Sequence, residues 1–313
     1  MRIFRHFDAL PATLRGAAAA VGNFDGVHPG HRAVINEAGA IAKDAGRPWA
    51  VLTFEPHPRR LFDPDAPPFR LTPLHAKARE IAGLGVDVIV VQRFDADFCR
   101  LPAEVFVTEV LVKGLGASHV VSGYDFVFGH KRGGNCEMLL KMGKRLGFGF
   151  TAVNAVADAG GQAYSSTRVR ERLAAADPKG AARVLGRPFE IEGRVIEGDK
   201  RGRTLGFPTA NVRLGEYLRP ANGIYAVRAS TGAGDDAPWL DGVANIGHRP
   251  MFPTNEVLLE VYLFDFTSDL YGRRLRVRLV DYLRPERKFD GIAALKAQIA
   301  DDCQRARRIL AAA

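Results

Sequence analysis

The chain has 313 residues, of which 47% are hydrophobic and 25% are charged, and its 44 Lys and Arg against 35 Asp and Glu give a formal net charge of +9. This composition excludes a disordered or collagen-like chain, and the length suits two domains of roughly 100–200 residues each. No apolar run approaches the roughly 20 residues that a bilayer-spanning helix needs, which excludes a protein with such a helix.

The positive charge is spread along the whole chain. Residues 1–186 contain 24 Lys and Arg against 18 Asp and Glu, and residues 187–313 contain 20 against 17. Because there is no basic tail or block of like charges, we expect sites for anionic small molecules and no nucleic-acid partner. The N-terminus lacks an apolar signal core, and Cys99, Cys136 and Cys303 form no Cys-x-x-Cys pair. We therefore expect a cytoplasmic protein without a membrane partner.

Short apolar runs alternate with helical patterns over the first 150 residues. The predicted strands are 18–24, 49–54, 86–91, 119–122 and 148–153, and the predicted helices are 31–45, 73–84, 102–115 and 135–146. Alternation of this kind predicts an α/β fold in which helices cover a parallel sheet and ligands bind at the carboxyl ends of the strands.

The second part of the chain changes from helical to strand periodicity. A helical segment at 167–182 leads to Gly186-Arg187-Pro188, which we interpret as a linker. Predicted strands follow at 189–196, 223–229, 240–246, 257–266 and 275–283, and a last helix is predicted at 291–310. We expect an antiparallel barrel or sandwich with a C-terminal helix, and two domains with the limits 1–186 and 187–313.

A candidate phosphate site follows the first predicted strand, in residues 22–31 (GNFDGVHPGH). The backbone N–H groups and the positive end of the next helix point toward a phosphate bound there. Gly26 and Gly30 allow a close approach of the backbone, and His28 and His31 can stabilise charge on a group in transfer. The alternative is a turn with two surface histidines.

A second candidate phosphate site, residues 165–170 (SSTRVR), lies at the start of the helical segment predicted at 167–182. Hydroxyl groups and free backbone N–H groups converge at the start of a helix, and Arg170 can hold phosphate through two hydrogen bonds. Taken alone, the segment is equally consistent with a capped helix that carries surface arginines.

Aromatic residues lie at the ends of two predicted strands, in residues 53–58 (TFEPHP) and 123–129 (GYDFVFG). Aromatic rings at strand ends can stack on a planar ligand, and Asp125 can accept hydrogen bonds from it. By themselves, aromatic residues at such positions belong more often to the core.

These segments together resemble the nucleotidyltransferases that share the fold of class I tRNA synthetases. His28-Pro29-Gly30-His31 matches their His-x-Gly-His signature, and the longer run around it is similar to the FAD synthetase branch. The resemblance implies catalytic roles for His28 and His31. It implies ATP or phosphate contacts from Gly22, Phe24, Gly26, Gly30, Ser166, Thr167, Arg168 and Arg170. It implies flavin contacts from Phe54, Pro56, Asp125 and Phe128.

A glycine-rich basic loop lies in the second half, in residues 198–211 (GDKRGRTLGFPTAN). Its glycines leave backbone amides free to cradle phosphates, and Thr209 and Asn211 offer the neutral oxygen ligands that suit a magnesium ion on nucleotide phosphates. The alternative is a charged hairpin loop.

A lone carboxylate lies in the apolar run 257–264 (VLLEVYLF). Strand alternation places Glu260 on one face with Leu258, Tyr262 and Phe264. A single carboxylate in a strand that is otherwise apolar is a candidate general base, and a structural carboxylate with a charged partner is the alternative.

The loop and this strand resemble the riboflavin kinases. Four further motifs agree, namely Asn222-Gly223-Ile224-Tyr225, Asn245-Ile246-Gly247, Asp269-Leu270-Tyr271-Gly272 and Leu283-Arg284-Pro285-Glu286. The resemblance implies ATP contacts from Gly198, Lys200, Gly202, Arg203 and Gly206. It also implies Mg²⁺ ligands at Thr209 and Asn211, and Glu260 as the base. His248 and Met251 stand where the family pattern has Thr, and Cys99 where it has Ala.

The two resemblances cover nearly the whole chain and imply the prokaryotic bifunctional riboflavin kinase/FAD synthetase family. We expect ATP to phosphorylate riboflavin to FMN and then to adenylylate FMN to FAD, with Mg²⁺ as the metal and self-association left open. One rival is a nucleotidyltransferase for another phosphorylated substrate, and another is an RNA-binding protein on a similar scaffold.

Overall fold

The computed structural model describes residues 1–198, 202, 205–232, 237–248 and 257–313. The chain divides into two compact units. The first contains Met1–Pro67 and Thr72–Ser165, and the second contains Pro68–Leu71 and Ser166–Ala313. The second unit thus includes a short N-terminal segment and the helices that precede residue 187. The predicted domain limits, 1–186 and 187–313, stay a prediction.

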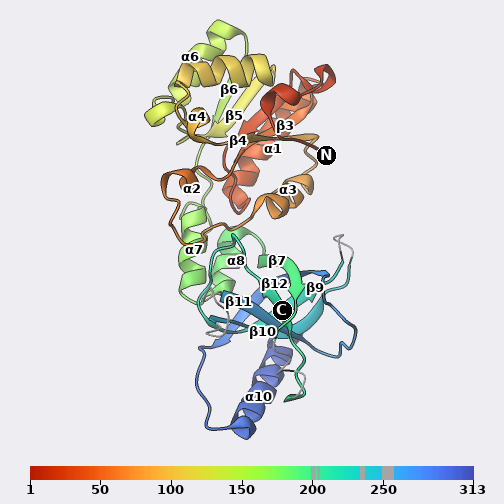
Figure 1. The fold of residues 1–313 in the computed structure, drawn as a ribbon. Coiled ribbons are helices and arrows are strands. Elements are labelled where there is room, and N and C mark those ends of the chain that lie inside the picture. Colours follow the sequence, from red (N-terminus) through yellow and green to blue (C-terminus); the bar gives the residue numbers. More distant parts are fainter. Residues whose placement is uncertain (199–201, 203–204, 233–236, 249–256) are drawn as a thin grey trace. The chain divides into compact units, whose positions relative to one another are not determined.

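A six-stranded parallel sheet forms the centre of the first unit (Figure 1). Its order is β1-β4-β3-β2-β5-β6, and each neighbouring pair is parallel, which confirms the predicted α/β fold. The strands are β1 (Arg2–Phe4), β2 (Ala18–Val21), β3 (Trp49–Glu55), β4 (Val88–Arg93), β5 (His119–Gly123) and β6 (Gly149–Val153). The strand order reverses between β2 and β5, and ligands bind at such a point in open α/β sheets.

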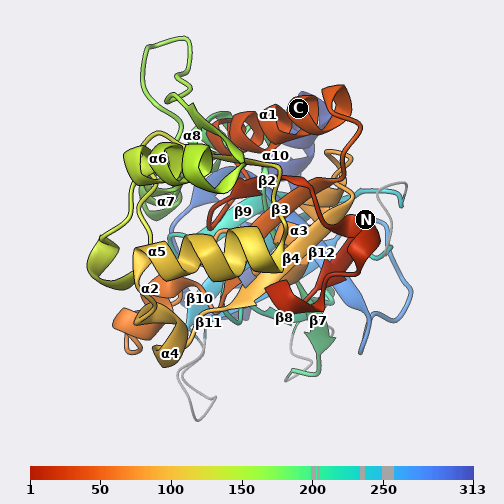
Figure 2. The same ribbon diagram turned by 90° about the horizontal axis from the view of Figure 1, so that it is seen from above.

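Helices cover both faces of this sheet (Figure 2). On one face, α1 (Pro29–Asp44) and α3 (Leu74–Ala82) bury Val34, Ile35 and Ile81. On the other, a π-helix (Phe106–Gly114) and α6 (Cys136–Leu146) bury Val110 and Leu139. Shorter helices are α2 (Pro58–Phe62), α4 (Ala96–Cys99) and α5 (Ala103–Val105), with 3-10 turns at Phe7–Ala9, Ala12–Leu14 and His130–Arg132.

The helix predicted at 102–115 is an α-helix only in its first turn, α5, and continues as the π-helix. Its wider hydrogen-bonding step is seen where the Leu115 N–H donates to the Val110 carbonyl. The buried residues repeat at intervals of four, in the series Phe106, Val110, Gly114 and the series Val107, Leu111, Leu115. Both series are buried against the sheet.

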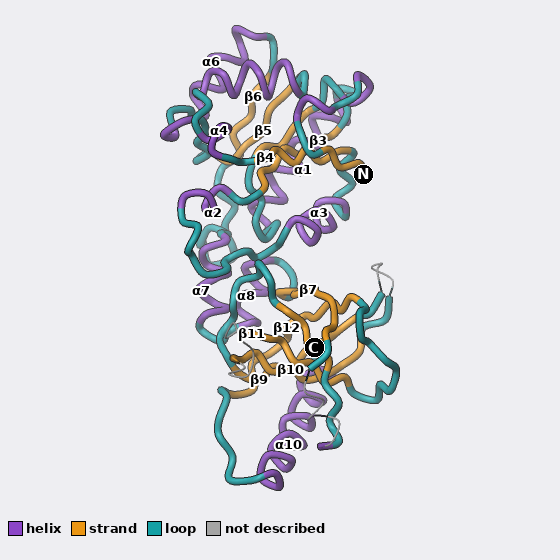
Figure 3. The backbone as a smooth tube through the Cα atoms, viewed as in Figure 1, coloured by secondary structure: helices purple, strands orange, loops and turns teal. Residues whose placement is uncertain are grey.

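A closed antiparallel barrel forms the centre of the second unit (Figure 3), so the sandwich alternative is excluded. Its order is β10-β11-β8-β7-β12-β9. The strands are β7 (Phe189–Ile196), β8 (Ala210–Arg213), β9 (Gly223–Ser230), β10 (Leu240–His248), β11 (Val257–Leu263) and β12 (Arg274–Arg284). Alternation along β11 places Leu259 and Val261 in the barrel core and Tyr262 on the outer face.

The C-terminal helix α10 (Ile292–Ala311) covers part of the outer face of the barrel. Ala306 and Leu310 of α10 pack with Val243 of β10, Ala226 of β9 and Leu283 of β12. The helical segment predicted at 167–182 is two helices, α7 (Ser166–Ala174) and α8 (Pro178–Leu185). They separate where Pro178 begins α8, because proline cannot continue a helix from the preceding turn. No helix of the described ranges is long and apolar enough to cross a membrane.

Candidate functional sites

Three predicted ligand segments of the first unit emerge from adjacent strands. Residues 53–58 complete β3, residues 22–31 follow β2 and residues 123–129 follow β5, and these strands are neighbours in the order β3-β2-β5. The Gly22 N–H donates to the Leu52 carbonyl over 3.1 Å, and Thr53 Oγ1 donates to the Asn23 carbonyl over 3.2 Å. The structure therefore brings these segments to one edge of the sheet, at the reversal of strand order.

His28 caps the first helix of the unit. Its Nδ1 accepts a hydrogen bond from the His31 N–H at 3.3 Å, and the two imidazole rings stack with centroids 3.6 Å apart. Because Nδ1 is the acceptor, the proton of the neutral imidazole lies on Nε2, which makes Nε2 a donor. A Cβ at position 30 would lie 3.2 Å from His28 Cε1, so Gly30 leaves room for the ring. His28 thus joins the N-terminus of α1 in an arrangement suited to an anion.

The loop before His28 holds an unusual backbone. Phe24 has φ 49° and Val27 has φ 47°, in the left-handed region that such residues rarely adopt, and Gly26 has φ 92°. Both side chains are buried, so the surrounding core enforces this conformation. Strained backbone that the surrounding core holds in place is typical of functional loops.

Asp25 anchors this loop, a role that the sequence did not indicate. It is buried, and its Oδ1 accepts the Thr72 N–H over 2.9 Å. The Gly26 N–H in turn donates to Thr72 Oγ1 over 2.8 Å. Asp25 therefore supports the loop from within.

Phe54 and Phe128, predicted to contact flavin, lie mainly in the hydrophobic core, and each is 7% exposed. Phe54 lies against Phe98 with ring centroids 6.0 Å apart, and Phe128 lies against Phe106 at 5.2 Å. Asp125 is exposed in the loop after β5, and Pro56 follows a cis peptide bond. Their contacts with flavin stay a prediction.

A buried lysine supports the segment after β3. Lys77 of α3 is fully buried, and its Nζ donates to Thr53 Oγ1 over 3.1 Å and to Glu55 Oε1 over 2.9 Å. Lys77 was not singled out from the sequence, because only the packing of α3 on the sheet shows that its side chain points inward.

Residues 166–170 of the second candidate phosphate site lie in the second unit. Ser166 is the first residue of α7, and Thr167 is exposed near its start. Arg168 and Arg170 are half-buried, and Arg170 Nε donates to the Phe69 carbonyl over 2.9 Å. The histidine loop belongs to the first unit.

Glu260 lies in a polar row across three strands of the barrel. Glu260 of β11 is paired with Asn211 of β8 on one side and with Asn245 of β10 on the other. Residues directly opposite in an antiparallel pair point to the same side, so all three side chains lie on the outer face. Glu260 is half-buried in a strand that is otherwise mostly buried, as its apolar neighbours predict.

The structure also places part of the glycine-rich loop. Asn211 is buried, and its Oδ1 has no hydrogen-bond donor among the described residues. A Cβ at position 198 would lie 2.3 Å from Asn211 Nδ2, so Gly198 makes room for this amide. A Cβ at position 202 would lie 3.2 Å from Thr209 Oγ1, and Gly206 has φ 88°. Lys200, Arg203 and Met251 lie outside the described residues, as does the side chain of His248.

Two titratable side chains in this part of the barrel unit, Tyr262 and Cys303, stay protonated at neutral pH. Burial raises the pKa of Tyr262 on the same face of β11. Burial also raises the pKa of the Cys303 thiol on α10 to about 11. Neither group can accept a proton at neutral pH, so neither is a candidate base.

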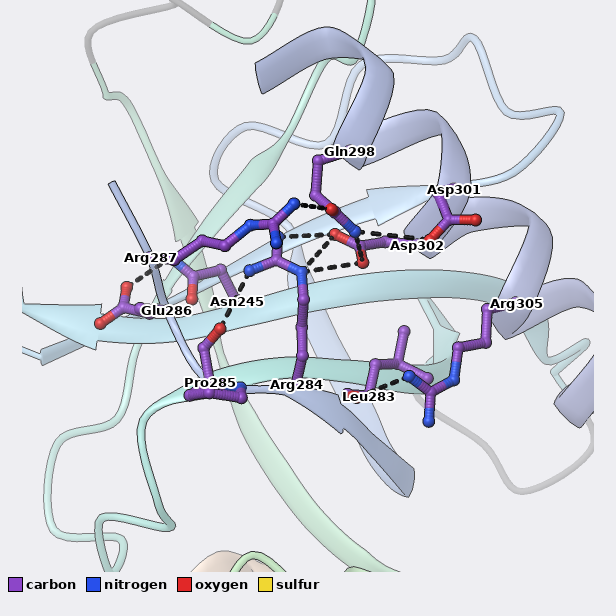
Figure 4. A network of polar contacts seen from close by, with 10 residues as sticks. All are labelled: Asn245, Leu283, Arg284, Pro285, Glu286, Arg287, Gln298, Asp301, Asp302 and Arg305. Atoms are coloured by element: carbon purple, nitrogen blue, oxygen red, sulfur yellow. Dashed lines mark hydrogen bonds and ion pairs between the residues drawn. The ribbon is translucent and has the colours of Figure 1, made fainter. Parts of the chain in front are cut away.

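An ion-pair network fixes the end of β12 to α10 (Figure 4). Arg284 donates from Nε and from Nη2 to the carboxylate of Asp302, the shortest contact being 2.7 Å, and Gln298 Nε2 donates to Asp302 Oδ1 over 2.9 Å. The Arg284 and Asp302 side chains are 16% and 5% exposed. Loss of one partner of such a buried pair leaves the other charge uncompensated.

We expect Asp302→Asn to lower the free energy of unfolding of the barrel unit by about 3 kcal/mol. Asp301→Asn is the matched control, because Asp301 is exposed and meets Gln298 only at 3.5 Å, and we expect a change within about 0.5 kcal/mol. Urea unfolding followed by Trp239 fluorescence, in a Trp49→Phe background, reports on this unit. Equal stability of the two variants would contradict the role of the pair.

Comparison with known proteins gives matches over both halves of the chain. A family model described as FAD synthetase matches residues 10–168, and one described as riboflavin kinase matches residues 185–310. The bifunctional riboflavin kinase/FMN adenylyltransferase of Escherichia coli K12 is 43% identical over 291 residues, which are 93% of this chain and 92% of that protein. The protein of the same name from Bacillus subtilis is 39% identical over 296 residues, 92% of this chain and 91% of that protein.

A solved structure is similar over nearly the whole length. It is named as a macrolide-efflux protein from Streptococcus pneumoniae, has 28% sequence identity and a TM-score of 0.84, and the alignment covers 98% of each chain. This likeness supports the fold described above for each unit.

Proposed function

The chain belongs to the family of bifunctional riboflavin kinase/FMN adenylyltransferases, and we propose which of its residues carry out the two reactions. ATP phosphorylates riboflavin to FMN, and a second ATP adenylylates FMN to FAD with release of pyrophosphate. We assign adenylyl transfer to residues 1–186 and the kinase to residues 187–313. The two family matches, at 10–168 and 185–310, support this division.

In adenylyl transfer, a phosphate oxygen of FMN attacks the α-phosphorus of ATP and pyrophosphate leaves. His28 donates from Nε2 to the oxygen on which negative charge grows, and His31 holds its ring in place by stacking. The backbone around Gly22, Gly26 and Gly30 and the start of α1 receive the phosphates. We assign Ser166, Thr167, Arg168 and Arg170 to the leaving phosphates of the same reaction. Phe24 supports the loop, with its ring against that of His31 at 5.5 Å.

In the kinase reaction, Glu260 takes the proton from the terminal ribityl hydroxyl of riboflavin as its oxygen attacks the γ-phosphorus, and ADP leaves. The observation that carries this assignment is the row Asn211–Glu260–Asn245, in which the carboxylate is flanked by amide groups. Gly198, Lys200, Gly202, Arg203 and Gly206 are assigned to the nucleotide by the family pattern.

Asn211 and Thr209 fit a magnesium ion. The buried Asn211 Oδ1 without a described donor is a neutral oxygen of the kind that Mg²⁺ accepts beside nucleotide phosphates. Bound there, the ion would neutralise charge on the phosphates during transfer. No cluster of three or more His, Cys, Asp or Glu suited to a metal occurs in the described part of the chain, so phosphate oxygens of the nucleotide would complete the ligand set.

Asn211→Leu tests the assignment of the barrel as the kinase half. The substitution keeps a side chain of similar size and removes the oxygen, so we expect the Mg²⁺ concentration for half-maximal FMN formation to rise about 10-fold or more. The Mg²⁺ dependence of FAD formation from supplied FMN serves as the control and should not move. An unchanged Mg²⁺ dependence of FMN formation would contradict the assignment.

We further propose that the protein acts in the cytoplasm on ATP, riboflavin and FMN, with no nucleic-acid or membrane partner. The free thiols of Cys99, Cys136 and Cys303 support a reducing compartment. The pairing of basic with acidic side chains on the surface, as in Arg307 with Asp265 and Lys113 with Glu109, supports this proposal.

A further inference from the structure

Asn245 lies directly opposite Glu260 in the pairing of β10 with β11. Directly opposite residues of an antiparallel pair have Cβ atoms about 4.5–5.5 Å apart. The amide of Asn245 is therefore beside the carboxylate proposed as the base, on the side away from Asn211. The motif Asn245-Ile246-Gly247 has no role in the functions described so far.

The orientation of the Asn245 amide is set by Glu286. Asn245 Nδ2 donates to Glu286 Oε1 over 3.1 Å (Figure 4), which assigns the other amide atom, Oδ1, as an acceptor. Asn245 Oδ1 is buried and receives no hydrogen bond from any described residue. A buried acceptor without a donor is unfavourable and marks a place where a ligand donor belongs.

Gly247 explains how the carboxylate of Glu286 reaches this position. A Cβ at position 247 would lie 2.1 Å from Glu286 Oε1, so Gly247 leaves room for the carboxylate in this position. Glu286 follows Arg284 by two residues, and the pair of Arg284 with Asp302 fixes that part of the chain to α10. The motifs 245–247 and 283–286, which are distant in sequence, thus together orient Asn245 Oδ1.

We propose that Asn245 Oδ1 accepts a hydrogen bond from a hydroxyl of the ribityl chain of riboflavin, and that Glu286 is the positioning residue for Asn245. This inference rests on the proposed role of Glu260. The substrate placed at Glu260 by its terminal hydroxyl carries further hydroxyl groups along the same short chain, and each is a donor. The phosphates of ATP carry acceptors only, so they cannot satisfy this oxygen.

Binding of riboflavin to the Asn245→Ala protein, by titration calorimetry with MgADP present, tests the proposal. We expect a dissociation constant about 10- to 100-fold above that of the unmodified protein, as loss of a buried hydrogen bond predicts, and a KM for ATP within about twofold. Glu286→Ala should weaken riboflavin binding in the same direction. Glu286→Gln is the matched control, because its amide oxygen still accepts from Asn245 Nδ2, and it should bind riboflavin nearly as the unmodified protein does.

Riboflavins that lack the 2′-, 3′- or 4′-hydroxyl identify the contact. One of these analogues should bind weakly to the unmodified protein, and Asn245→Ala should weaken that analogue little further, since the hydrogen bond is already absent. The inference is overturned if Asn245→Ala binds riboflavin as the unmodified protein does, or if it weakens all three analogues and riboflavin by the same factor.

Failure of the inference is distinguishable from failure of the proposed function. If Glu260→Gln stops FMN formation and Asn245→Ala leaves riboflavin binding unchanged, only the inference is wrong. If Glu260→Gln leaves FMN formation unchanged, the site itself is misplaced and the inference falls with it. Thermal unfolding of each variant checks that the barrel remains folded.

Discussion

Glu260→Gln is expected to lower the rate of FMN formation by about 10²- to 10⁴-fold, the range for loss of a general base. Glutamine has nearly the same shape and can keep hydrogen bonds to neighbours, but it cannot take a proton from the ribityl hydroxyl. The polar row of β8, β11 and β10 would stay in place, because strand pairing does not depend on the carboxylate. The initial rate of FMN formation from riboflavin and MgATP, with products resolved by chromatography, measures the effect.

The same Glu260→Gln protein provides its own control. Its rate of FAD formation from supplied FMN should equal that of the unmodified protein, because the His28 loop belongs to the other unit. An FMN formation rate within twofold of the unmodified value would show that Glu260 is not the base. Equal loss of both reactions in a folded variant would contradict separate sites.

His28→Asn is expected to lower FAD formation from FMN by about 10²- to 10³-fold, the effect of removing one donor to charge in the transition state. Asparagine is a good N-cap and can replace His28 Nδ1 as acceptor for the His31 N–H, so α1 should still begin at Pro29. What it removes is the imidazole with its Nε2 donor and the stacking on His31.

Phosphorylation of riboflavin by the His28→Asn protein should proceed at the unmodified rate. His28→Ala removes the cap as well, and it should lose at least as much FAD formation and some stability of the first unit. The role of His28 would be wrong if the asparagine variant formed FAD at the unmodified rate.

The order of elements was predictable where periodicity is strong. The apolar runs that became β2, β3 and β5, with helices between them, predicted a parallel sheet and the edge at which its ligand loops meet. β1 was not predicted because it has only three residues, and β8 was not predicted because its first two residues end the segment 198–211, which we interpret from the sequence as a loop. The sequence thus predicts a loop at Asn211, whereas in the structure this residue lies on β8.

The sequence was enough to predict which residues carry the chemistry of the candidate sites, but not which side chains hold those residues in place. The motif around His28 and the lone Glu260 could be read from the sequence, whereas the roles of Asp25 and Lys77 depend on tertiary packing. The relation of Asn245 to Glu260 needs the register of β10 on β11, which sequence spacing alone does not determine. The sequence could not show whether the aromatic residues Phe54 and Phe128 belong to the core or contact a ligand, because that depends on the hydrophobic cluster around them.

Mixing two variants, each deficient in one of the two reactions, tests most directly the claim that each half of the chain performs its own reaction. With riboflavin and MgATP as the only substrates, Glu260→Gln alone should form neither flavin nucleotide, and His28→Asn alone should form FMN and little FAD. An equimolar mixture should form FAD, because FMN released by the second protein is adenylylated by the first. Failure of the mixture to form FAD, when Glu260→Gln still converts supplied FMN, would contradict the account.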